Sequence, residues 1–217
     1  MIKDSRQGAS DCFVVVETEN PATTRSVGAC FAQILMKNDV VALDGDLGAG
    51  KTCFVGGVAK ALGISGRVTS PTFTLVTEHP IPRSLDTDGE VLLAGESRRD
   101  RDQPNALYHF DAYRLPCSKA FSDIGLMEYF TAGGVCFIEW AERIRALLPS
   151  RTLFIRLERL VNNSILEDEP CLVDGSIVLP SDDQRRRLTF AGKATRINAF
   201  KAALERHNIG VVQDGCS

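Results

Sequence analysis

The chain has 217 residues, 44% of them hydrophobic and 24% charged, with a formal net charge of −3 at pH 7. This length suits one domain that buries a full core without disulfides or a structural metal. Proteins that hold nucleic acid on their own surface usually carry an excess of basic residues. This chain has no such excess, which argues against that class of protein. No apolar run approaches the ~20 residues that cross a bilayer, and the first residues contain no signal-peptide core. We therefore expect a cytoplasmic protein without membrane contact, which meets nucleic acid through partner proteins.

The seven cysteines form an odd set without a CxxC pair. Three of them, Cys30, Cys53 and Cys136, stand in apolar stretches and are expected to act as small hydrophobic residues. The pattern therefore favours neither a disulfide framework nor a zinc site.

The first elements are predicted from hydrophobic spacing. Residues 13–17 are β-branched and predict a strand. Thr23 or Thr24 is expected to cap a helix. Its apolar face is predicted at helical spacing and comprises Val27, Phe31, Ile34 and Leu35. The apolar run 40–43 predicts a second strand that leads into a glycine-rich loop.

That loop, residues 45–52, has the complete phosphate-binding pattern GxxxxGKT. Its glycines let successive backbone N–H groups point at phosphate oxygens, and the helix that follows adds its N-terminal dipole. The predicted phosphate-binding residues are Leu47, Gly48, Ala49, Gly50, Lys51 and Thr52. Lys51 can reach the β- and γ-phosphates, and the Thr52 hydroxyl can bind Mg²⁺. A helix over 53–62 that ends at Gly63 completes the unit, so we expect the chain to bind a nucleoside triphosphate.

The rest of the chain continues to alternate between strands and helices. The predicted strands are 74–78, 106–114, 135–140, 152–158 and 186–190, and the predicted helices are 122–130, 141–148 and 195–206. Two stretches, 80–105 and 162–183, lack a sustained apolar period and are expected to be surface insertions. The alternation predicts an α/β sandwich of the P-loop NTPase type, with helices flanking a mostly parallel sheet. We expect a single domain over residues 1–217, with a C-terminal helical extension from about residue 191.

A carboxylate follows the apolar run 135–138. Glu139 is the expected second anchor of Mg²⁺, because strands of such sheets end near the phosphates. The alternative is a strand-end acid that faces solvent. Asp44 lies beside the loop and is less well placed to face the metal, and Trp140 is expected either to cap the core or to lie near the nucleotide.

Polar residues mark a second strand, 106–114. On an extended strand His109, Asp111 and Tyr113 share one face. Asp111 could orient the attacking water, and Arg114 could compensate charge on the γ-phosphate. From the pattern alone a polar edge strand is the favoured alternative. The segment 70–73, with hydroxyls on either side of a proline, is either a sensor of the γ-phosphate or a plain turn.

Four motifs together resemble one family. They are the loop 45–52, Ser-Pro-Thr-Phe at 70–73, His-Phe-Asp-Ala-Tyr-Arg at 109–114 and Ile-Glu-Trp at 138–140. In this order they resemble the bacterial tRNA threonylcarbamoyladenosine biosynthesis ATPase, TsaE. The resemblance spans about residues 22–158 apart from the first insertion, and neither insertion interrupts a motif.

The resemblance implies a weak, Mg²⁺-dependent ATPase that converts ATP to ADP and phosphate. It implies a requirement for this protein in N6-threonylcarbamoylation of adenosine 37 in tRNAs that read ANN codons, in a complex with TsaB and TsaD homologues that hold the tRNA.

Carried over by position, the resemblance assigns phosphate binding to Leu47 through Thr52 and Mg²⁺ binding to Thr52 and Glu139. Asp111, Lys51 and Glu139 are the implied catalytic residues. Trp140 lines the implied site, while Thr24 and Arg185 flank the nucleotide.

Two alternatives use the same loop. One is a P-loop small-molecule kinase, which would need an acceptor site beyond the ambiguous strand at 109–114. The other is a nucleotide-dependent interaction module without useful hydrolysis.

Overall fold

The computed structural model describes residues 11–71, 74–82, 102–113, 115, 118–160, 171–173, 176–178 and 184–216. Its elements, in chain order, are β1 (Asp11–Thr18), α1 (Pro21–Ala32), β2 (Val40–Asp44), α2 (Lys51–Ala61), β3 (Val76–Pro80), β4 (Ala106–Asp111), α4 (Ser118–Asp123), η1 (Leu126–Thr131), β5 (Val135–Glu139), η2 (Ala141–Leu147), β6 (Leu153–Arg159), β7 (Cys171–Val173), β8 (Ser176–Val178), β9 (Arg186–Lys193), α5 (Ala194–Arg206) and β10 (Gln213–Cys216), where η marks a 3-10 helix.

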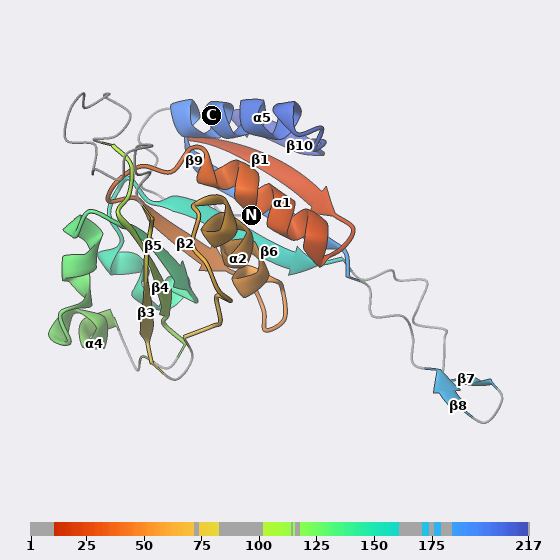
Figure 1. Ribbon diagram of the computed structural model, residues 1–217, viewed down its shortest axis with the longest axis horizontal. Helices are drawn as coiled ribbons and strands as arrows, with labels where there is room; N and C mark the ends of the chain where they lie inside the picture. The colour runs from red at the N-terminus through yellow and green to blue at the C-terminus, as the bar shows by residue number, and fades with distance from the viewer. Residues whose placement is uncertain are drawn as a thin grey trace, which may run out of the picture.

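One eight-stranded sheet, in the order β10-β1-β9-β6-β2-β5-β4-β3, organises the protein (Figure 1). Its four central strands, β6, β2, β5 and β4, run parallel, as predicted. The outer strands β10, β1, β9 and β3 pair antiparallel with their neighbours. Antiparallel neighbours need no crossover helix, and the sequence predicts no helix between β3 and β4 or between β6 and β9. The sheet is therefore parallel around the phosphate loop and antiparallel on both flanks.

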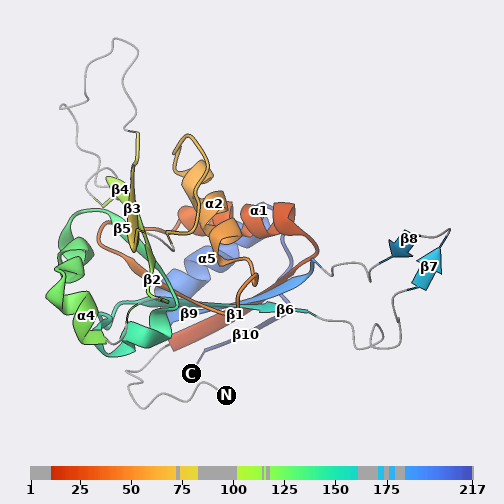
Figure 2. The same cartoon turned by 90° about the horizontal axis from the view of Figure 1, so that it is seen from below.

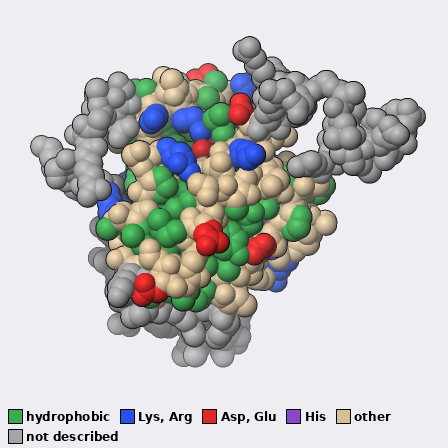
Figure 3. Space-filling model, turned by 90° about the vertical axis from the view of Figure 1, so that its left-hand side faces the viewer, with side chains coloured by type: hydrophobic (Ala, Val, Ile, Leu, Met, Phe, Trp, Pro, Cys, Tyr) green, Lys and Arg blue, Asp and Glu red, His purple; other side chains and the backbone are tan. Residues whose placement is uncertain are grey.

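Alternating residues of the central strands feed two cores, one on each face of the sheet. Val41 and Leu43 of β2 pack with α1, α2 and α5, whereas Val40 and Ala42 pack with α4, η1 and η2. Figure 2 shows α1 and α2 together on one side of the sheet. On the side that carries α4, hydrophobic side chains show among polar ones, and Lys and Arg side chains gather in the upper part of the view (Figure 3). This two-faced burial is what an α/β sandwich requires.

Helix α1 begins at a different cap from the one predicted. Asn20 is the N-cap, its Oδ1 accepts a hydrogen bond from Thr23 N at 3.0 Å, and its own N–H donates to Thr23 Oγ1 at 3.3 Å. Thr23 is therefore the third residue of a capping box, and neither Thr23 nor Thr24 is the cap. All four residues of the predicted apolar face are buried, but only Val27 and Phe31 belong to the helix, because α1 ends at Ala32 and Ile34 and Leu35 follow it.

The close contact of α1 with α2 depends on two glycines. A Cβ on Gly28 would lie 2.4 Å from the Phe54 carbonyl oxygen, and one on Gly57 would lie 2.2 Å from that of Arg25. Such distances are shorter than any contact that a real Cβ makes, so only glycine fits at both positions. The contact places the N-terminus of α1 beside that of α2, where Cys53 Sγ donates to the Pro21 carbonyl at 3.4 Å.

Several boundaries differ from prediction. Strand β4 ends at Asp111, so Tyr113 lies in the turn after it. The predicted helix 122–130 is divided into α4 and η1 at Gly125, whose φ of +76° is left-handed. Chain after α5, for which the sequence predicts no strand, forms β10.

Strand β10 also brings two cysteines together. Cys12 of β1 pairs in register with Cys216 of β10, and the two form a disulfide across 204 residues of sequence. The cysteine spacing does not predict this disulfide, because the bridge depends on pairing between β1 and β10, which are far apart in the sequence. Cys30 and Cys136 are buried free thiols, as predicted, and Cys53 is half-buried.

The two predicted insertions lie largely outside the described residues. Within the first, β3 extends to Pro80; within the second, β7 and β8 pair antiparallel. The single-domain organisation therefore stays a prediction. Among the described helices, none has both the length and the apolar character to cross a membrane.

Candidate nucleotide-binding site

The phosphate loop joins the end of β2 to the start of α2. Gly45, Gly48 and Gly50 have φ angles of +140°, +76° and +105°, values that residues with a side chain rarely adopt. A Cβ on Gly45 would also lie 2.2 Å from the Leu157 carbonyl oxygen. These conformations curl the chain ahead of the helix N-terminus, the arrangement that exposes backbone N–H groups to an anion. Leu47, at the tip of the loop, is 87% exposed.

Lys51, the first residue of α2, is buried inside the loop. Its Nζ donates to the carbonyl oxygens of Gly45 at 2.6 Å and Asp46 at 3.1 Å. Burial lowers the pKa of the amine, and the nearby carboxylates of Glu139 and Asp111 oppose that shift. The ammonium group is therefore held over the loop, where it can exchange carbonyl partners for phosphate oxygens.

Thr52 and Glu139 come together across two neighbouring parallel strands. Thr52 Oγ1 donates to Glu139 Oε1 at 2.8 Å, because β2 and β5 pair with Leu43 opposite Glu139 and so end side by side. Glu139 is 4% exposed, so the alternative of a solvent-facing acid is wrong. A hydroxyl and a carboxylate oxygen are hard donors of the kind that Mg²⁺ prefers, and this pair fits that ion.

His109 of β4 is the second partner of Glu139. The His109 Nε2 lies 2.9 Å from Glu139 Oε1, and the imidazole is fully buried. Because a carboxylate only accepts hydrogen bonds, Nε2 carries the proton of this contact. Thr52 and His109 thus fix the orientation of one carboxylate oxygen from two sides.

Asp111 stands beside Glu139 at the ends of β4 and β5, which pair in register at these residues. One Asp111 oxygen accepts from Ser70 Oγ at 3.2 Å and the other from Tyr113 N at 3.0 Å. Asp111 is 5% exposed. Strand β4 lies between β3 and β5, so the interpretation of 106–114 as a polar edge strand is wrong.

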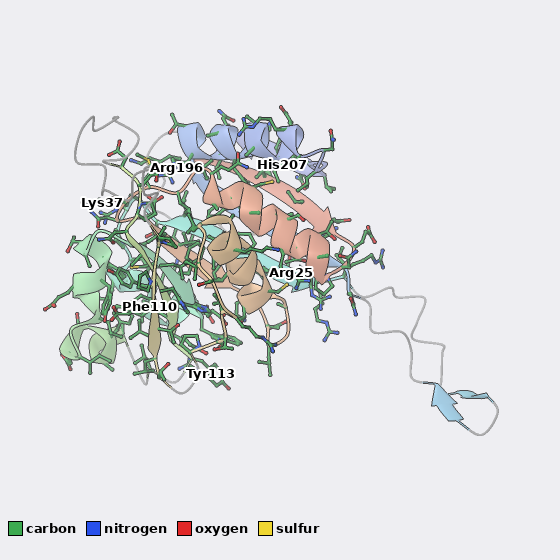
Figure 4. All side chains as sticks on the ribbon, viewed as in Figure 1. Arg25, Lys37, Phe110, Tyr113, Arg196 and His207 are labelled. Atoms are coloured by element: carbon green, nitrogen blue, oxygen red, sulfur yellow. A yellow bond between two sulfur atoms is a disulfide. The ribbon has the colours of Figure 1, made fainter. Side chains whose placement is uncertain are left out.

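Aromatic side chains close one side of the loop. Trp140 directly follows β5 with a left-handed φ of +58°, and its ring centroid lies 4.3 Å from Lys51 Nζ, a cation–π distance. Tyr113, which Figure 4 labels, packs against Trp140 with ring centroids 5.0 Å apart. Trp140 therefore contacts the lysine of the loop and also packs against the core on the α4 side, so both of its predicted roles remain open.

Asp44 does not join this group. Its carboxyl instead interacts with the carboxyl of Glu142 in η2 and with the guanidinium of Arg145. Burial and the neighbouring Glu142 carboxyl raise the pKa of Asp44 to about 7. Its Oδ1 atom is buried without a hydrogen-bond partner among the described residues. The prediction that Asp44 is less well placed for the metal agrees with this pairing.

Thr24 and Arg185, the predicted flanks of the nucleotide, differ in their surroundings. Thr24 is buried, and its hydroxyl bonds Thr18 Oγ1 at 2.9 Å. The Arg185 carbonyl accepts from Leu160 N, whereas its neighbour Arg186 reaches the loop, with NH2 3.4 Å from the Gly48 carbonyl oxygen.

The resemblance points to the neighbourhood of Arg185, and within it the structure selects Arg186, which the sequence does not single out from the three arginines at 185–187. The sequence pattern includes His109 but does not indicate that its imidazole contacts Glu139. The predicted residues Thr72, Phe73 and Arg114 lie outside the described part of the chain.

Comparisons with known proteins agree on one family. Residues 18–165 match the family model described as threonylcarbamoyl adenosine biosynthesis protein TsaE. The chain is 33% identical over 191 residues to the tRNA threonylcarbamoyladenosine biosynthesis protein TsaE of Bacillus subtilis, a match that spans 88% of this chain and 93% of that protein. It is 39% identical over 137 residues to the protein of the same name from Treponema pallidum, covering 63% of this chain and 85% of the relative.

A solved structure supports the same relationship. The crystal structure of YdiB from Bacillus subtilis superposes with a TM-score of 0.58 at 30% sequence identity, over 90% of this chain and 96% of that one. The predicted P-loop NTPase fold is thereby confirmed.

Proposed function

This chain belongs to the TsaE family, and from that premise we propose that it is a slow Mg²⁺-dependent ATPase required for threonylcarbamoyladenosine formation in tRNA. The family places its role in tRNA threonylcarbamoyladenosine biosynthesis. The observation that carries the ATPase proposal is the convergence of Lys51, Thr52 and Glu139, with the Thr52–Glu139 contact at 2.8 Å.

Each residue of the site has a proposed part. The backbone of residues 47–52 and the Lys51 ammonium would hold the β- and γ-phosphates. Thr52 and Glu139 would hold Mg²⁺, which when bound neutralises charge on the phosphate oxygens. Asp111 would orient the attacking water, because its carboxylate lies beside Glu139 and is itself oriented by Ser70 and the Tyr113 N–H.

The slow rate is proposed from the resemblance to the family alone. The proposed partners are homologues of TsaB and TsaD, which would hold the tRNA, in keeping with a chain of net charge −3. The site is proposed to work in the cytoplasm, where tRNA is modified.

The test measures ATP binding, ATP hydrolysis and threonylcarbamoyladenosine formation separately. We expect the purified protein to bind ATP, and Lys51→Ala to weaken that binding about 10- to 100-fold, since charge-assisted hydrogen bonds are lost. Equilibrium titration with a fluorescent ATP analogue measures the affinity. Threonylcarbamoyladenosine formation in tRNA, assayed with TsaB and TsaD homologues with and without ATP, measures the pathway.

Two outcomes would contradict the proposal. ATP affinity that is unchanged in Lys51→Ala would remove the phosphate-loop assignment. Phosphoryl transfer to a metabolite, found in a substrate screen, would replace the ATPase with a small-molecule kinase.

A further inference from the structure

A cleft of about 620 Å³ lies on the outer side of α2, between that helix and the segment that follows it. Its lining includes Arg25 of α1, Thr52, Gly56 and Lys60 of α2, and Arg67 and Val68 beyond α2. We call it the cationic cleft. Its volume is in the range of sites for small ligands. Because Thr52 also contacts Glu139, the cleft opens directly beside the candidate nucleotide site.

Positive charge is concentrated in this cleft. Arg25, Lys60 and Arg67 line it, and the lining residues include no Asp or Glu. Arg25, labelled in Figure 4 where α1 runs alongside α2, donates to Cys53 Sγ at 3.5 Å. In the part of the chain that the structure describes, the side chains of Lys60 and Arg67 form neither an ion pair nor a hydrogen bond. Three cations without a lining acid, in a chain of net negative charge, favour an anionic ligand.

Gly56 supplies a second observation. Glycine is unfavourable inside a helix, and its neighbour Gly57 is explained by the close approach of α1. A Cβ on Gly56 would meet no heavy atom of the described residues within 4 Å. Packing within the described chain therefore does not require glycine at position 56, whereas close approach of a ligand to the helix backbone would.

We propose that the cationic cleft binds a phosphate ester, separately from the nucleotide held in the phosphate loop. Guanidinium groups of Arg25 and Arg67 match phosphate oxygens in a bidentate manner, and Ile64 and Val68 supply an apolar wall for the sugar or base. The ester is a free mononucleotide, because a chain of net charge −3 lacks the basic excess with which proteins hold an RNA strand on their own surface. The proposal rests on the cleft itself and does not require that the phosphate loop hydrolyse ATP.

The experiment uses the full-length protein with its phosphate loop filled by a saturating non-hydrolysable ATP analogue and Mg²⁺. AMP is titrated by calorimetry, and a short fluorescein-labelled single-stranded RNA is titrated by anisotropy at several salt concentrations. We expect the double variant Lys60→Glu/Arg67→Glu to weaken binding about tenfold or more, because two charged partners of phosphate are reversed. The matched control Lys37→Glu/Lys193→Glu reverses two exposed charges outside the cleft and is expected to change affinity less than about twofold.

The two probes distinguish a free nucleotide from a strand: AMP binding without RNA binding supports the proposal, and RNA binding without AMP binding overturns it. A second variant, Gly56→Leu, leaves every charge in place and is expected to block the cleft, while thermal unfolding shows that the variant is folded. Absence of binding by both probes overturns the proposal, as does unchanged binding in the Lys60→Glu/Arg67→Glu variant. Equal weakening of the ATP analogue itself also overturns it, because the cleft would then belong to the loop's own nucleotide.

Discussion

Two pairs of acidic residues near the same end of the sheet have different surroundings. Glu139 and Asp111 are each bonded by donors: Thr52 and His109 for the first, Ser70 and the Tyr113 N–H for the second. Asp44 meets a second carboxyl, Glu142, and its pKa rises to about 7. Hydrogen-bond donors orient the oxygens of Glu139 and Asp111 as acceptors. When two carboxyl groups face each other, in contrast, the pKa of one of them rises. The comparison separates two carboxylates suited to a cation from a carboxyl whose raised pKa favours its protonated form.

The largest expected effect is at Glu139. Glu139→Ala removes a proposed metal ligand and should lower ATP turnover about 10²- to 10³-fold, while ATP binding measured without Mg²⁺ stays close to that of the wild type. A steady-state phosphate-release assay over a Mg²⁺ titration measures turnover, and equilibrium titration with a fluorescent ATP analogue in the absence of Mg²⁺ measures binding. Asp111→Asn is the matched variant and should lower turnover while keeping the Mg²⁺ dependence. Normal hydrolysis by Glu139→Ala would show that the metal assignment is wrong.

A smaller effect is expected at His109, which acts through Glu139 and is a positioning residue. His109→Ala should weaken Mg²⁺ affinity about 10- to 100-fold, the usual range when the partner of a metal ligand is lost. His109→Gln should restore part of that affinity, since its amide nitrogen can take the place of Nε2, whereas the shorter His109→Asn should not. The Mg²⁺ concentration at half-maximal turnover is the measurement. Equal loss in the Gln and Asn variants would point to general destabilisation of β4 instead.

The smallest effect on activity is expected at the second pair, where the change concerns stability. The pKa of Asp44 is raised from 3.8 to about 7 in the folded chain. The protonated carboxyl therefore contributes stability that is present below about pH 4 and is lost as the pH rises through about 7. Asp44→Asn cannot ionise, so its stability relative to the wild type should increase between these pH values, by on the order of 4 kcal/mol.

Urea unfolding of both proteins at pH 5 and at pH 8 measures this difference. Glu142→Gln should reduce the pH dependence in the same direction, because it removes the carboxyl that faces Asp44. A constant stability difference between Asp44→Asn and wild type at both pH values would contradict the raised pKa of Asp44.

Features that depend on contiguous stretches of sequence are predicted correctly. The phosphate loop, α2 and the apolar strands β2 and β5 follow from contiguous patterns, and the Glu139 assignment follows from one rule about where strands end. Tyr113 was placed on the wrong element because a strand boundary depends on pairing, and β4 stops where β3 and β5 stop pairing with it. The edge-strand alternative is wrong because β3 pairs with the outer side of β4, a pairing that the sequence of β4 does not show. The polar side chains of β4 can be buried because neighbouring residues supply hydrogen-bond donors.

The sequence by itself determined that a phosphate loop joins a buried strand to a helix, and that an acid closes another buried strand. These features depend on glycine conformations and on hydrophobic runs, both of which are local. Only the tertiary structure decided that His109, Thr52 and Glu139 meet at one oxygen, that Asp44 faces the carboxyl of Glu142, and that Cys12 bonds Cys216. Strand order and register bring these distant residues within bonding distance, and register arises from the packing of the whole sheet.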